Sequence, residues 1–108
     1  MKLNVGERLI LMGVLPSENN FLTLKIVRGL VEKLGLKDEE FKEFEIIQEG
    51  NNVRWNTLGN DEREIQIGEK ETDIIIEALK KLNNENKLTQ RHFTLYEKFV
   101  KEWLLWEK

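Results

Sequence analysis

The Glu-Gly-Asn-Asn segment at residues 49–52 limits what this chain can fold into more than any other feature. Glycine and asparagine tolerate the positive φ angles that tight hairpin turns require. Residues 45–48 and 53–56, on either side of this turn, have the composition of short strands. We therefore predict a β-hairpin near the middle of the chain. Helical patterns before and after it make the expected fold class α+β.

Two long helices are predicted before the hairpin. Asn4 can cap the first, Glu7 can complete its capping box, and Pro16 ends it. Apolar residues recur at helical spacing over residues 21–34, which predicts the second helix. Gly35 would then occupy the left-handed position just past that helix, as in a Schellman cap.

A short third helix is predicted over residues 39–44, with Asp38 as its cap. After the hairpin, residues 64–67 alternate polar and apolar and predict a third strand. A helix over residues 69–82 and a final helix complete the order ααα-ββ(β)-αα. We expect the helices to pack on a small antiparallel sheet within one compact domain spanning residues 1–108.

Composition narrows the classes of protein. Hydrophobic residues make up 40% and charged residues 34% of the 108, which is a globular balance. The chain has no cysteine, so disulfides, thiolate metal sites and cysteine nucleophiles are excluded. Its first residues do not resemble a secretory signal, and no apolar stretch is long enough to span a membrane. We expect a cytoplasmic protein with no membrane partner.

Charge is distributed unevenly along the chain, whose net charge is -3. Residues 37–50 contain two basic and six acidic side chains. Such a segment repels a phosphate backbone, whereas nucleic-acid affinity depends on neutralising phosphates. Nucleic acid is therefore not the favoured partner.

A winged helix is nevertheless the leading alternative, because helix, helix, short helix and hairpin follow in that order. In a winged-helix DNA-binding regulator, the third helix would enter the major groove. Here that helix carries Asp38, Glu39 and Glu40, and the hairpin adds only Arg54 as a cation. We expect the N-terminal half to use a winged-helix-like topology for structure.

The chain shows no active-site pattern, so we predict that it is not an enzyme. His92 is the only histidine, and it falls in the apolar arc of the final helix, where a structural role is the more frequent one. Residues 83–94 lack the glycine and the final glutamate of a calcium loop. Neighbouring acids such as Asp61 and Glu62 are typical of solvated loops. No cofactor, metal or small-molecule substrate is predicted.

The final helix, capped by Thr89 and extending to about Trp106, offers the best candidate binding residues. Its apolar side chains cover about half of the helix circumference, more than a surface helix needs to face its core. Either this helix lies deepest in the core, or one flank is a partner surface. We predict the second, in a protein complex or by self-association, through residues Trp103, Leu105 and Trp106.

Four segments resemble small uncharacterised proteins of bacteriophages and prophages. The resemblance implies a phage-encoded accessory protein and assigns no functional residue. The lack of an active-site pattern and the broad apolar face of the final helix favour a non-enzymatic protein-binding or assembly protein. The segments are Val5-Gly6-Glu7-Arg8-Leu9, Asn20-Phe21-Leu22-Thr23-Leu24-Lys25, Val53-Arg54-Trp55-Asn56 and Leu95-Tyr96-Glu97-Lys98-Phe99.

Overall fold

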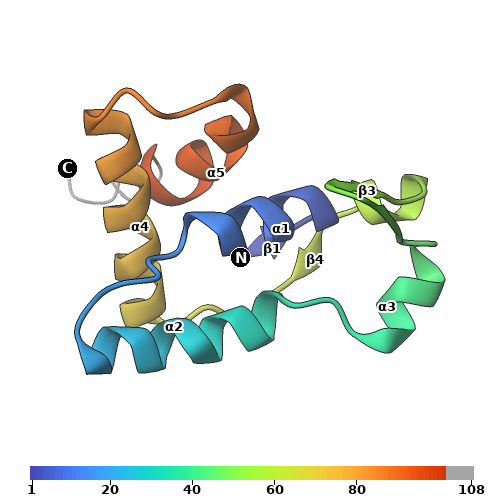
Figure 1. The fold of residues 1–108 in the computed structure, drawn as a ribbon, viewed down its shortest axis with the longest axis horizontal. Helices are drawn as coiled ribbons and strands as arrows, with labels where there is room; N and C mark the ends of the chain where they lie inside the picture. The colour runs from blue at the N-terminus through green and yellow to red at the C-terminus, as the bar shows by residue number, and fades with distance from the viewer. Residues whose placement is uncertain (102–108) are drawn as a thin grey trace.

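The computed structural model describes residues 1–101 and confirms the α+β class (Figure 1). Besides the helices, residues 1–101 contain two small antiparallel sheets of two strands each. The elements are β1 (Lys2–Leu3), α1 (Val5–Val14), α2 (Phe21–Leu34), α3 (Asp38–Glu43), β2 (Ile47–Glu49), β3 (Asn52–Arg54), η1 (Thr57–Asn60), β4 (Arg63–Glu64), α4 (Glu69–Asn84), η2 (Gln90–His92), α5 (Phe93–Tyr96) and η3 (Glu97–Lys101).

Helix α1 begins as its sequence predicts. The Asn4 side chain accepts a hydrogen bond from the Glu7 backbone amide at 2.8 Å, and the Glu7 carboxylate accepts one from the Asn4 amide at 3.1 Å. These reciprocal bonds form the expected capping box. The helix ends at Val14, two residues before Pro16.

Helix α2 has the predicted bounds, but the prediction of a left-handed cap at Gly35 is wrong. Gly35 has φ -60° and ψ 147°, which is extended backbone and not the left-handed conformation. Its amide still donates to the carbonyl of Val31 at 2.9 Å. The carbonyls of Leu34 and Gly35 accept bonds from the Arg8 side chain, so a residue of α1 satisfies the end of α2.

Helix α3 starts at Asp38, which therefore does not act as the predicted cap. The cap position belongs to Lys37, whose amide donates to the Glu40 carboxylate at 3.0 Å. The Glu40 carboxylate, inside the first turn, accepts from the amide of the residue that precedes the helix.

The hairpin is present as predicted, with Gly50 at φ 59° in its turn. A third strand is present over Arg63–Glu64, but it shares only Glu64 with the predicted residues 64–67, and it does not extend the hairpin. It pairs with β1, where Leu3 lies opposite Arg63. The strands therefore make two separate sheets, because the partner of β4 is the N-terminal segment.

The segment after α4 is less regular than predicted. The Thr89 side chain accepts a bond from the Arg91 amide at 3.2 Å, which confirms Thr89 as a cap. A 3-10 turn, the short helix α5 and the π-helical segment η3 follow, where one continuous α-helix was expected.

Apolar packing is concentrated in two parts of the chain, residues 1–35 and 63–101, which we call the helical body. Residues 36–62, which we call the acidic lobe, comprise α3, the hairpin and η1 at one end of the molecule (Figure 1). Phe44 is the only large apolar side chain of the lobe that is buried. The core cluster lies entirely in the body: Leu3, Leu11, Leu15, Val27, Leu30, Leu34, Ile75, Ile76, Leu79, Leu95, Phe99 and Val100.

Within residues 1–101, every helix is too short or too polar to cross a membrane.

Candidate functional site

The three residues predicted to bind a partner, Trp103, Leu105 and Trp106, lie outside the residues that the structure describes. His92 has a capping role, because its Nδ1 atom accepts a hydrogen bond from the Thr89 amide at 3.0 Å. It is the terminal member of a capping box, and within residues 1–101 it belongs to no group of side chains that could hold a metal ion.

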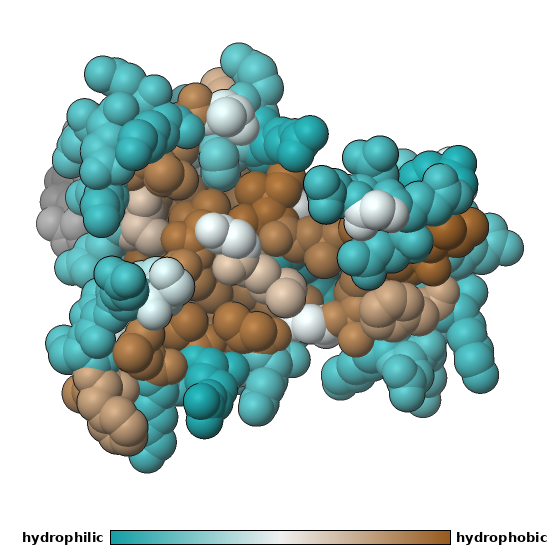
Figure 2. Space-filling model, viewed as in Figure 1, coloured by the Kyte–Doolittle hydropathy of each residue, from teal (hydrophilic) through white to brown (hydrophobic). Residues whose placement is uncertain are grey.

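The acidic lobe exposes three large apolar side chains that sequence reasoning missed. Phe41 of α3 is 46% exposed, Ile47 of β2 is 49% exposed and Leu58 of η1 is 47% exposed. Figure 2 shows hydrophobic side chains at the surface over this end of the molecule, surrounded by hydrophilic ones. The sequence offered a signal at Phe41, which is the one apolar residue among the charged residues of Asp38–Glu43.

The hairpin explains why Ile47 faces solvent. Ile47 lies opposite Arg54 in the register, so both side chains leave the same face of the hairpin. Val53, the next residue along β3, projects from the other face and is partly buried. A shallow hollow of about 580 Å³ lies at the base of the hairpin, between Glu45 and Arg54, with Ile47 in its lining.

Trp55 packs against one glycine of its own lobe, Gly59, and against one glycine of the body, Gly6. A Cβ added to Gly59 would lie 2.5 Å from Cδ1 of Trp55, and one added to Gly6 of α1 would lie 3.4 Å from its Cζ2 atom. The indole therefore packs closely against both backbones. Its Nε1 atom donates to the Asn60 side chain at 3.1 Å. At Gly6 an added Cβ would make only an ordinary van der Waals contact with the ring, so Gly59 is the glycine that this packing requires.

Arg8 provides the most buried link between the two parts, with its side chain only 3% exposed. Its Nη1 atom donates to the Glu40 carboxylate of α3 at 2.6 Å, while Nε and Nη2 donate to the carbonyls of Leu34 and Gly35 at 3.0 and 2.8 Å. Nη2 also donates to the Glu40 carboxylate at 3.1 Å, so a carboxylate and two carbonyls compensate the buried charge.

Lys98 makes a second link. Its ammonium bonds to Glu7 of α1 at 2.8 Å, to Glu62 of the lobe and to the carbonyl of Lys2 at 2.9 Å. Glu7 is itself buried. Neighbouring residues of α1 thus hold opposite charges that point to different partners, Glu7 toward η3 and Arg8 toward α3.

The link carboxylates have altered acidity. Hydrogen bonding to Arg8 lowers the pKa of Glu40 despite its partial burial. Hydrogen bonding to Arg63 likewise lowers the pKa of Glu43, and hydrogen bonding to Lys98 lowers that of Glu62. Arg63 also lies over the Phe44 ring, with its guanidinium carbon 4.7 Å from the ring centroid. These acids stay ionised to hold the lobe on the body.

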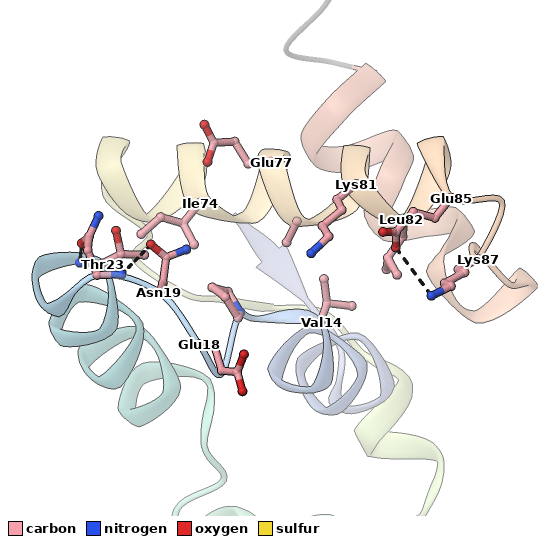
Figure 3. Close-up of a pocket in the computed structure, with 13 residues that line it drawn as sticks. Val14, Glu18, Asn19, Thr23, Ile74, Glu77, Lys81, Leu82, Glu85 and Lys87 are labelled. Atoms are coloured by element: carbon pink, nitrogen blue, oxygen red, sulfur yellow. Dashed lines mark hydrogen bonds and ion pairs between the residues drawn. The ribbon is translucent and has the colours of Figure 1, made fainter.

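A separate cleft of about 520 Å³ lies in the body, between α4 and the connection from α1 to α2 (Figure 3). Lys81 points from α4 toward the end of α1 at Val14, and Ile74 adds to the apolar floor. The rim mixes acidic residues such as Glu18 with basic ones such as Lys87. This mixture gives the cleft no preference for a cation or an anion.

Metal binding has no candidate ligand set within the described residues, where no group of three or more histidine, aspartate or glutamate side chains could hold an ion. The neighbouring acids Asp61 and Glu62 do not form such a group. The lobe itself combines exposed apolar side chains with a net negative charge.

Comparison with known proteins adds no relative: no protein-family model, no curated protein and no solved structure matches this chain. The resemblance to phage proteins stays a sequence-based prediction.

Proposed function

We propose that the chain is a non-enzymatic binding protein that recognises another protein through the apolar side chains of its acidic lobe. The cytoplasm as its compartment and an accessory role in a phage belong to the same proposal and rest on the sequence. The observation that carries the proposal is the exposure of Phe41, Ile47 and Leu58, each close to half.

Single exposed apolar side chains are ordinary on protein surfaces. These three differ because they share a segment of the chain that adds only Phe44 to the buried apolar side chains. Their exposure therefore does not result from a large core that has more apolar side chains than it can bury. Apolar groups on a loop-rich segment attached to a rigid scaffold are typical of recognition surfaces.

The charge of α3 argues against the alternative, a winged-helix DNA-binding regulator. The expected order of helices and hairpin is present, but the helix that would enter the groove exposes Asp38 and Glu39. Phosphate repulsion would oppose docking at every DNA sequence. The surface of a protein partner, unlike that of DNA, need not be negatively charged.

Selection from a random-peptide display library tests the proposal. We expect peptides that bind the wild type and fail to bind a variant with Phe41→Ser, Ile47→Thr and Leu58→Ser. The matched control is Phe21→Ser with Leu22→Ser, which removes side chains that are 82% and 60% exposed at the start of α2 in the body.

Selected peptides should bind the Phe21 and Leu22 control as they bind the wild type. If every enriched peptide still bound the lobe variant, or lost binding only to the control, recognition would not use the lobe. Thermal melts of all three proteins would verify that each is folded, and light scattering would show whether the wild type self-associates through the same side chains.

A further inference from the structure

The net negative charge of the molecule lies in the acidic lobe. Residues 36–62 contain eight acidic and three basic side chains, whereas the remaining residues contain twelve acidic and fourteen basic ones. The lobe therefore carries -5 and the rest of the chain +2. This separation of charge follows the same boundary as the separation of apolar packing.

Four of the lobe's acids are held in ion pairs. Glu40, Glu43 and Glu62 pair with Arg8, Arg63 and Lys98 of the body, and Glu49 pairs with Arg54 across the hairpin. These four charges are neutralised within the molecule.

Asp38 and Glu39 are used differently. Both are exposed, and neither side chain forms a hydrogen bond or ion pair within residues 1–101. Asp38 lies three residues before Phe41 on α3, so the two side chains are neighbours on one side of the helix. An uncompensated carboxylate thus stands beside one of the exposed apolar side chains.

We infer that the lobe's partner is a basic protein segment whose apolar side chains cover Phe41, Ile47 and Leu58 while its lysines or arginines face Asp38 and Glu39. This inference rests on the proposed function and adds the chemistry of the partner. Opposite charge at the rim of an apolar patch steers association and excludes acidic competitors. An acidic or phosphate-bearing ligand would meet repulsion at the same place.

The composition of the selected peptides is the first test. Among the peptides that bind the wild type and not the Phe41, Ile47 and Leu58 variant, we expect an excess of lysine and arginine, together with large apolar residues. Lobe-dependent peptides with no such excess over the unselected library would overturn the inference and leave the proposed function standing. A complete lack of lobe-dependent peptides would overturn both.

The second test removes charge without removing apolar surface. Asp38→Asn with Glu39→Gln should weaken binding of the selected peptides by roughly three- to tenfold at low salt, and the difference should shrink as salt is added. Glu18→Gln, an exposed acid of the body, is the control and should leave affinity unchanged. Equal affinity of the wild type and the double variant at low salt would overturn the inference.

Discussion

The helical body and the acidic lobe are held together by different forces. The body buries a continuous apolar cluster contributed by α1, α2, α4 and the C-terminal helical segments. The lobe buries Phe44, packs Trp55 against two glycines and is tied to the body by ion pairs from Arg8, Arg63 and Lys98. Apolar burial is not directional, whereas ion pairs and hydrogen bonds fix position.

This difference teaches how a small protein can present apolar groups without hiding them. A lobe held by a large core would draw Phe41, Ile47 and Leu58 inward. A lobe held by polar links keeps its orientation while those side chains stay in solvent. Substitutions at the polar links and substitutions at apolar contacts should therefore change the stability of the protein differently.

The largest effect is expected at the buried link between the two parts. Arg8→Ala should lower the free energy of unfolding by about 3 to 5 kcal/mol, because it removes the guanidinium from two helix-end carbonyls and from the Glu40 carboxylate, which keeps only the Lys37 amide as a donor. Urea denaturation measures the change. Lys33→Ala removes the exposed pair with Glu71 and should cost about 0 to 1 kcal/mol. Equal losses would mean that Arg8 does not anchor the lobe.

A smaller loss is expected where Trp55 meets η1. Gly59→Ala should cost about 1 to 3 kcal/mol, because the new Cβ would lie 2.5 Å from the indole and the ring must shift. Denaturant midpoints report the loss. Combining it with Trp55→Leu should recover part of the stability, since the smaller side chain leaves room for the methyl group. An unchanged midpoint for the single variant would contradict the packing of Trp55 on Gly59.

Acid should loosen the lobe before the body. The pKa values of Glu40, Glu43 and Glu62 are lowered in the folded state by their cationic partners. Their stabilisation is therefore complete above the unfolded value, about 4.3, and is lost as pH falls below it through the lower folded values. Amide hydrogen exchange should show hairpin amides losing protection in that range while those of α4 keep it. Simultaneous loss in both regions would contradict separate attachment.

The sequence predicts a feature well where neighbouring residues determine it, and poorly where residues distant in the chain determine it. The cap at Asn4, the bounds of α2 and the turn at Gly50 depend on neighbouring residues, and these predictions are confirmed. The pairing of β1 with β4 joins residues 2 and 64, and two-residue strands have no periodicity to detect. The extended Gly35 follows from Arg8, which is distant in the sequence.

The candidate site was less predictable than the fold. Burial of Glu7 and Arg8 contradicts what charged residues usually do, and only their distant partners explain it. Phe41 is exposed although it is aromatic, because no residue of α3 is buried. Conversely, the aromatic residues that the sequence favoured, Trp103 and Trp106, lie outside the described residues, so their role stays a prediction.

The smallest expected effect has the opposite sign and concerns the body. Gly29 lies inside α2, and a Cβ added there would meet no atom within 4 Å. Gly29→Ala should therefore raise the free energy of unfolding by about 0.5 to 1 kcal/mol, because alanine loses less backbone freedom than glycine on entering a helix. Gly59→Ala, the same substitution, is expected to lower the free energy of unfolding. The difference between the two variants therefore reports local packing and not the replacement of glycine as such. Denaturation midpoints that move in the same direction for both variants would mean that α2 and η1 do not differ in packing as the structure describes.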